Sequence, residues 1–171
     1  MRTREQLNAV IKAYDVRGVV GEDIDDALVR DTGAAFAAIL REEGETTVAV
    51  GHDMRPSSPQ LAAAFAEGAA AQGLNVIQLG LTSTDELYFA AGHLNCAGAM
   101  FTASHNPAKY NGIKLCRAGA VPVGQETGLE QIKDMLIDGT PAFDGEPGTV
   151  TEREVLGDYA DFLRGLVPLE N

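Results

Sequence analysis

The residues best suited to chemistry lie in one short polar stretch, Thr102 to Asn111, which reads TASHNPAKYN. Ser104 offers a hydroxyl nucleophile with His105 beside it, and Lys109 and Lys114 bring positive charge from either side of an Asn-Gly turn. A serine hydroxyl can accept or donate a phosphoryl group, cations offset the charge on the phosphoryl oxygens, and turn amides can hold a phosphate. These residue types therefore predict phosphoryl transfer.

A turn-forming connector is the alternative interpretation of this stretch, because Ser, His, Asn and Pro also satisfy local hydrogen bonds in loops. The distribution of charge favours phosphate chemistry. The chain has 13 Lys plus Arg against 25 Asp plus Glu, a net charge of -12 that disfavours nucleic acid and anionic membranes as partners. Between Leu87 and Ala118, however, there is no acidic residue, whereas Lys109, Lys114 and Arg117 are basic. The overall acidity therefore does not exclude a phosphorylated substrate here.

The rest of the chain indicates an α/β domain with alternating strands and helices. The expected strands are Val16–Val20, Thr46–Val50, Asn75–Leu79, Ala97–Phe101 and Ile113–Cys116. The expected helices are 25–43, 58–73, 84–92, 127–136 and 153–166, with a surface connection at 138–148. Helical crossovers make the central strands parallel, whereas the last strand follows too closely for a crossover and is expected to be antiparallel. We predict a three-layer α/β/α domain with a mixed, mostly parallel sheet.

In this architecture, ligands gather outside the carboxyl ends of the parallel strands. Two polar loops are expected there, Gly51 to Ser58 and Thr102 to Asn111. Cys96 and Cys116 are too few for a disulfide framework and are predicted to be free, buried thiols in a reducing compartment. No apolar run is long enough to span a membrane. We therefore expect a cytoplasmic protein.

Four segments, in order, resemble the α-D-phosphohexomutase superfamily of phosphomannomutases and phosphoglucomutases. TASHNP is similar to the phosphoserine signature of that family, and the other matching segments lie before and after it. The four segments are KAYDVRG at 12–18, GHDMRPSS at 51–58, TASHNP at 102–107 and NGIK at 111–114. The flanking helical pattern extends the resemblance over essentially the whole chain. The segment at 80–88, GLTSTDELY, looks closest to phosphomannomutase-type members.

The resemblance implies an enzyme that interconverts hexose 6-phosphate and hexose 1-phosphate through a bisphosphorylated sugar, with Mg²⁺ as cofactor and a hexose bisphosphate as activator. By this resemblance Ser104 is the phosphoserine, and its phosphate oxygen is one Mg²⁺ ligand. Lys114 is the leading candidate for general acid or base at the sugar hydroxyl. His105 supports the phosphate or shares in proton transfer, and Arg17 contacts the transferring phosphoryl group.

Further residues carry weaker expectations from the same resemblance. Tyr14 is expected to line the entrance, Asn106 to position the loop, and Lys109 and Arg55 to contact phosphate. For Arg55, an ion pair with Asp53 that clasps its own loop is the favoured alternative.

Other positions have structural explanations that compete with a chemical role. Asp15 and Arg17 could form only an intrachain pair, and the acids at 23–26 are best explained as a helix cap rather than a metal site. His52 stands where the family has arginine, so a constant electrostatic role is not expected there.

The resemblance reaches only the first of the four domains of the family. We expect residues 1–171 to be that first domain, with the metal loop, the sugar-recognition loop and the phosphate-binding loop of the later domains absent. Mg²⁺ needs about six oxygen ligands, so the remaining ones are expected from a missing domain. The isolated chain, a piece of a larger mutase, is predicted to have little or no mutase activity.

Its expected partners are a phosphorylated hexose and the downstream domains. The alternative is a stand-alone phosphate or sugar-phosphate binding module.

Overall fold

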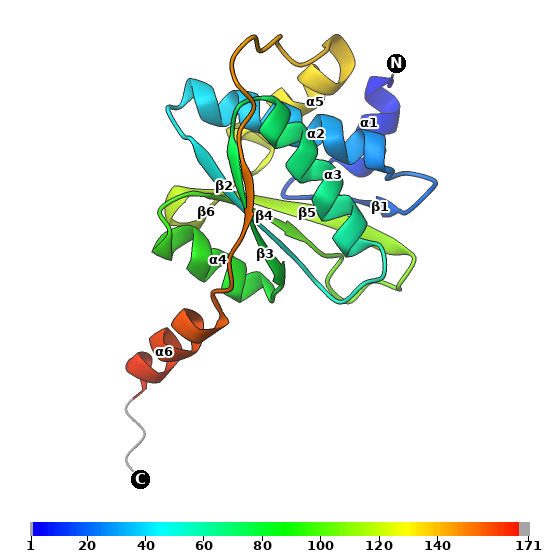
Figure 1. The fold of residues 1–171 in the computed structure, drawn as a ribbon. Helices are drawn as coiled ribbons and strands as arrows, with labels where there is room; N and C mark the ends of the chain where they lie inside the picture. The colour runs from blue at the N-terminus through cyan, green and yellow to red at the C-terminus, as the bar shows by residue number, and fades with distance from the viewer. Residues whose placement is uncertain (1, 168–171) are drawn as a thin grey trace.

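A mixed seven-stranded sheet is the middle layer of the computed structural model, which describes residues 2–167 (Figure 1). Its strand order is β1-β5-β4-β2-β3-β7, with β6 paired to β5. The strands are β1 (Val16–Val19), β2 (Thr47–His52), β3 (Asn75–Leu81), β4 (Ala97–Phe101), β5 (Tyr110–Arg117), β6 (Val121–Pro122) and β7 (Val150–Glu152). The pairings among β4, β2, β3 and β7 are parallel, whereas those of β1, β5 and β6 are antiparallel. The predicted α/β class, the mixed sheet and the antiparallel β5 are confirmed.

Helices cover both faces of this sheet. They are α1 (Arg4–Val10), α2 (Asp26–Glu42), α3 (Ser58–Ala71), α4 (Thr84–His93), α5 (Leu129–Asp138) and α6 (Leu156–Leu166). The helices α1, α2, α3 and α5 pack over one face and α4 over the other, which gives the three layers (Figure 1). None of the helices in the described part of the chain is long and apolar enough to cross a membrane.

The predicted elements agree with the structure to within a few residues, and the differences have local causes. The sequence pattern favours Ser58 and Thr84 as the caps of α3 and α4, whereas the caps in the structure are Ser57 and Ser83, one residue earlier. The helix predicted to begin at Arg153 begins at Leu156, because the Arg153 amide donates to a β3 carbonyl and continues the sheet. The helix α1 and the short strands β6 and β7 were not predicted. Both strands are exposed and too short for a periodic pattern.

The last helix, α6, extends away from the sheet and touches the body through α4 (Figure 1). Its contact is aromatic: the Phe89 ring lies 5.1 Å from that of Phe162 and 5.4 Å from that of Tyr159. No residue of α6 is buried. The end of the predicted domain range, 168–171, lies outside the described residues.

Both cysteines are free and buried, as predicted. Burial raises the pKa of the Cys116 thiol to about 12 and also raises that of Cys96. Because the thiolate is the reactive form, we expect neither thiol to be alkylated by iodoacetamide at pH 8 in the folded protein. Mass spectrometry after a timed reaction measures this. Both cysteines should react in denaturant, and equally fast labelling of the native chain would contradict the prediction.

Candidate functional site

Ser104 lies at the carboxyl end of β4, on an exposed loop that leads into β5. Its backbone has a φ of 54°, a left-handed conformation that costs a residue with a β-carbon about 1 kcal/mol or more. The Ser104 amide donates to Thr102 Oγ1 over 3.0 Å, which helps to hold this conformation. The Ser104 hydroxyl oxygen lies 3.3 Å from His105 Nδ1. The serine is therefore exposed and has a ring nitrogen beside its hydroxyl.

The strand register brings Arg17 and Lys114 to the same face of the sheet near this loop. Arg17 lies opposite Gly112, and Lys114 is two residues further along β5, so their side chains point the same way. Asp15 joins them: its Oδ2 accepts a 2.6 Å hydrogen bond from Arg17 Nη2 and lies 3.7 Å from Lys114 Nζ. The predicted Asp15–Arg17 pair is present, and a shared carboxylate orients both cations.

Arg17 also reaches the serine loop itself. Its Nη1 donates to the Ala103 carbonyl oxygen over 3.5 Å, directly before Ser104. Its Nε is buried and has no hydrogen-bond partner among the described residues. The Arg17 and Lys114 side chains are 22% and 30% exposed, so each cation is partly screened from water and still accessible to an anion. This arrangement can attract and orient a phosphoryl group beside the serine.

A hollow of about 390 Å³ opens beside Ser104, between the ends of β2, β3 and β4. Its size is within the range of small-molecule sites. It is lined by Asp53, Met54, Leu81, Thr82, Ser83, Thr84, Met100, Thr102 and Ser104. The predicted meeting of the two polar loops at the strand ends is confirmed, because Asp53 and Ser104 share this hollow.

Arg55 has a different role from the phosphate contact that the resemblance implied. All five of its side-chain N–H groups are used within the protein: Nε bonds Asp53, and both Nη atoms bond carbonyl oxygens of the serine loop. The residue is 9% exposed. No donor is left for a phosphate, so the expected contact is not supported. The favoured clasp with Asp53 is present.

The Asp53 carboxylate is ionised in a network that holds it in place. Burial by itself raises the pKa of Asp53, but hydrogen bonds from Ser58, the Arg55 amide and Thr102, with the Arg55 charge, lower it overall. Asp53 Oδ1 accepts from the Ser58 hydroxyl over 2.6 Å and from the Arg55 amide over 3.0 Å. This contribution to stability is present above the unfolded pKa of the carboxyl and is lost as pH falls through the folded pKa.

The expected Asn111-Gly112 turn is wrong, because both residues lie inside β5 and are buried. The Asn111 side chain is fully buried and donates to the hydroxyls of Ser57 and Ser58 over 2.8 and 2.9 Å. A bulkier residue in place of Gly112 would meet the Val16 carbonyl oxygen on the neighbouring strand. Asn111 therefore links β5 to the start of α3, and Gly112 allows the close approach of β1. The backbone groups available to a phosphate lie earlier, within 104–109.

The other predicted site residues are spread around the loop. Asn106 contacts Arg55 through its backbone, because its carbonyl oxygen accepts a hydrogen bond from Arg55 Nη2. The Lys109 side chain lies 5.7 Å from the ring centroid of Tyr110 and is exposed. Tyr14 is 79% exposed and lines a separate hollow of about 440 Å³ with residues of the 122–127 segment. The structure brings His105 to Ser104 and Arg17 to the serine loop, links Lys114 to Arg17 through Asp15, and places Tyr14 in a different hollow.

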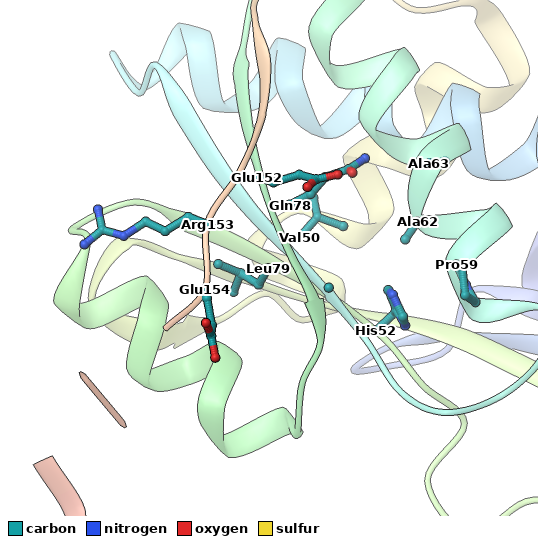
Figure 2. Close-up of a pocket in the computed structure, with 11 residues that line it drawn as sticks. Val50, His52, Pro59, Ala62, Ala63, Gln78, Leu79, Glu152, Arg153 and Glu154 are labelled. Atoms are coloured by element: carbon teal, nitrogen blue, oxygen red, sulfur yellow. The ribbon is translucent and has the colours of Figure 1, made fainter. Parts of the chain in front are cut away.

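A further hollow, of about 470 Å³, lies on the α3 side of the sheet at the ends of β2, β3 and β7 (Figure 2). His52 lies near Pro59 at one end of it, while Glu152 and Arg153 come from the opposite side (Figure 2). The His52 Nδ1 is 2.9 Å from the Asp53 carbonyl oxygen. The hollow contains none of the predicted site residues.

A magnesium site is not formed by the described residues alone. Between residues 2 and 167, no three His, Cys, Asp or Glu side chains are grouped to hold a metal ion. Asp25 caps α2 as predicted, accepting from the Leu28 amide, whereas Asp23 accepts from the Val19 amide at the end of β1. The described residues therefore do not supply a complete Mg²⁺ ligand set by themselves.

The fold and its polar loops define a three-layer α/β/α domain with a candidate ligand site at the carboxyl ends of its parallel strands. The chain belongs to the phosphoglucomutase/phosphomannomutase family, because residues 8–141 match the alpha/beta/alpha domain I of that family. The family membership predicted from the four segments is confirmed.

Relatives and solved structures agree with this membership. The chain is 47% identical over 137 residues to a protein described as phosphohexose mutases from Xanthomonas campestris, covering 80% of this chain and 30% of the relative. It is 38% identical over 163 residues to a phosphomannomutase of Escherichia coli, covering 94% and 35%. A crystal structure of a phosphoglucomutase/phosphomannomutase family protein from Burkholderia thailandensis superimposes with a TM-score of 0.87 at 30% identity, covering 100% of this chain and 38% of that one. The chain spans about a third of the length of these relatives.

Proposed function

We propose that the chain is the phosphoserine-carrying first domain of a phosphohexomutase that interconverts hexose 6-phosphate and hexose 1-phosphate. The observation that supports this most directly is the exposed Ser104 hydroxyl, with His105 beside it and Arg17 and Lys114 held nearby by one carboxylate. The family membership and the mutase names of the relatives support the substrate class. A hexose bisphosphate is proposed as the activator that phosphorylates Ser104.

In the step that phosphorylates the enzyme, the Ser104 hydroxyl attacks the phosphorus of one phosphate group of the bisphosphate. The new serine–phosphate bond forms as the phosphorus–oxygen bond to the sugar breaks, and the serine proton ends on the released sugar hydroxyl. Arg17 stabilises the charge on the transferring phosphoryl group. Lys114 gives and takes the proton at the sugar oxygen, and His105 supports the phosphate from the Ser104 side.

Further parts of the proposal concern the chain as a whole. Residues 1–171 are domain I, and later domains supply the sugar-selecting residues and the Mg²⁺ ligands other than the serine phosphate. The isolated chain should therefore show little or no mutase turnover. The two free cysteines favour a reducing, cytoplasmic location.

Intact-mass spectrometry tests the phosphoserine directly. We expect the purified chain, treated with glucose 1,6-bisphosphate, to gain the mass of one phosphoryl group, localised to Ser104 by fragmentation. The Ser104→Ala variant is the control and should gain nothing. If the wild-type chain binds the bisphosphate by calorimetry but never gains the adduct, the stand-alone binding module is the correct interpretation instead.

A further inference from the structure

Arg55 is bound to the serine loop more extensively than to its own loop. Its Nη1 donates to the carbonyl oxygens of Pro107 and Tyr110 over 2.8 and 3.1 Å. Its Nη2 donates to those of Ser104 and Asn106 over 2.8 Å each. We propose that Arg55 is a positioning residue that holds the Ser104 loop in the conformation needed for phosphoryl transfer. The proposal rests on the function proposed for Ser104.

The four inward carbonyl groups determine where the loop amides point. In a trans peptide the C=O and the N–H of the following residue point in opposite directions. The Ser104 and Pro107 carbonyls face Arg55, so the amides of His105 and Ala108 face away from it. Neither amide donates a hydrogen bond within residues 2–167. Arg55 therefore leaves two backbone donors turned outward, on the side where a phosphate on Ser104 would project.

A lysine could not replace this arrangement. Guanidinium is planar and presents five donors in a fixed fork, whereas an ammonium is a point charge with three. A chain of hydrogen bonds from β5 orients the Arg55 guanidinium: Asn111 bonds Ser58, Ser58 bonds Asp53, and Asp53 bonds Arg55 Nε over 3.1 Å. Arg55 is also nearly buried, so its charge depends on the Asp53 carboxylate for compensation. The loop is thus fixed before any ligand arrives.

The left-handed backbone conformation of Ser104 also depends on Arg55. The Arg55 bond to the Ser104 carbonyl and the Thr102 bond to the Ser104 amide fix the peptides on both sides of this residue. Loss of the guanidinium releases one of those peptides and allows Ser104 to relax to a negative φ. The hydroxyl then loses its fixed direction relative to Arg17 and Lys114.

Hydrogen exchange and phosphate uptake on the full chain test the proposal. The variant is Arg55→Lys, and the matched control is Arg30→Lys, because Arg30 also bonds a carboxylate through its side chain but lies exposed on α2. We expect Arg55→Lys to speed amide exchange within 104–111 by tenfold or more, with exchange in α2 and α3 unchanged. We also expect its rate of phosphate uptake from glucose 1,6-bisphosphate to fall at least tenfold at saturation. Arg30→Lys should change neither.

A milder variant covers the case in which Arg55→Lys does not fold. Ser58→Ala removes one bond that orients Asp53 and should give an intermediate increase in exchange, confined to 53–58 and 104–111. Unchanged exchange of the serine loop in both variants would overturn the proposal, whether or not Ser104 takes up phosphate. Faster exchange with an unchanged uptake rate would also overturn it, because the contact would then be structural only. If the wild-type chain takes up no phosphate, the proposed function of Ser104 fails, and the positioning role fails with it even where exchange shows that Arg55 holds the loop.

Discussion

Gly68→Ala is expected to lower the midpoint of thermal unfolding by roughly 6 to 12 °C, from a loss of about 3 kcal/mol. Gly68 is in α3, at its crossing with α2. A β-carbon there would overlap the Arg30 carbonyl oxygen and crowd the Ala34 amide, and both of these belong to the backbone of α2. Backbone atoms cannot rotate away as side chains do, so the two helices must separate and lose packing over the shared core.

The matched control is Gly92→Ala in α4, where an added β-carbon meets nothing within 4 Å. There, alanine should stabilise the helix by about 0.5 to 1 kcal/mol, because it has less backbone freedom to lose than glycine. Differential scanning calorimetry of both variants measures the contrast. Equal midpoints for Gly68→Ala and the wild-type chain would contradict the close approach of α2 and α3.

The sequence is a good guide to this fold where the pattern is periodic. The helix α2 has buried apolar residues at helical spacing, an Asp25 cap and a Gly44 stop, and its predicted bounds are within one residue of the structure. The strand β4 is buried at every position and was predicted without error. The strand β7 was missed because its three residues are exposed and pair only with β3. A short edge strand depends on its neighbour, which a local pattern does not contain.

For the site, the sequence predicts which residue types gather, but not how each is used. Loop positions at the strand ends were sufficient to place Asp53 near Ser104. The orientation of Arg55 was not predictable, because its four carbonyl partners are backbone atoms that carry no residue signature. The sharing of Asp15 by Arg17 and Lys114 depends on the β1–β5 register, which joins segments about a hundred residues apart. Contacts of this kind need the tertiary fold.

Lys114→Met is expected to slow phosphate uptake by Ser104 by 10²- to 10⁴-fold, the usual contribution of a positioned acid–base group. Methionine keeps the apolar stem of the side chain and removes the ammonium. The Lys114 Nζ is the cation on the site face of β5, 3.7 Å from Asp15. Without it, the sugar oxygen of the bisphosphate lacks its proton donor as the phosphorus–oxygen bond breaks. Asp15 stays paired with Arg17, so the remaining cation keeps its position.

Single-turnover uptake from glucose 1,6-bisphosphate, followed by intact mass over time, measures the rate with binding saturated. Lys12→Met is the matched control: Lys12 is an exposed lysine before β1, its side chain makes no hydrogen bond or ion pair among the described residues, and its loss should change the rate less than twofold. If Lys114 only helped to bind the bisphosphate, its loss would weaken binding and spare the saturated rate. An acid–base role lowers the saturated rate itself. A Lys114→Met rate within threefold of the wild-type value at saturation would therefore remove Lys114 from the chemical step and leave Arg17 and His105 as the groups that serve Ser104.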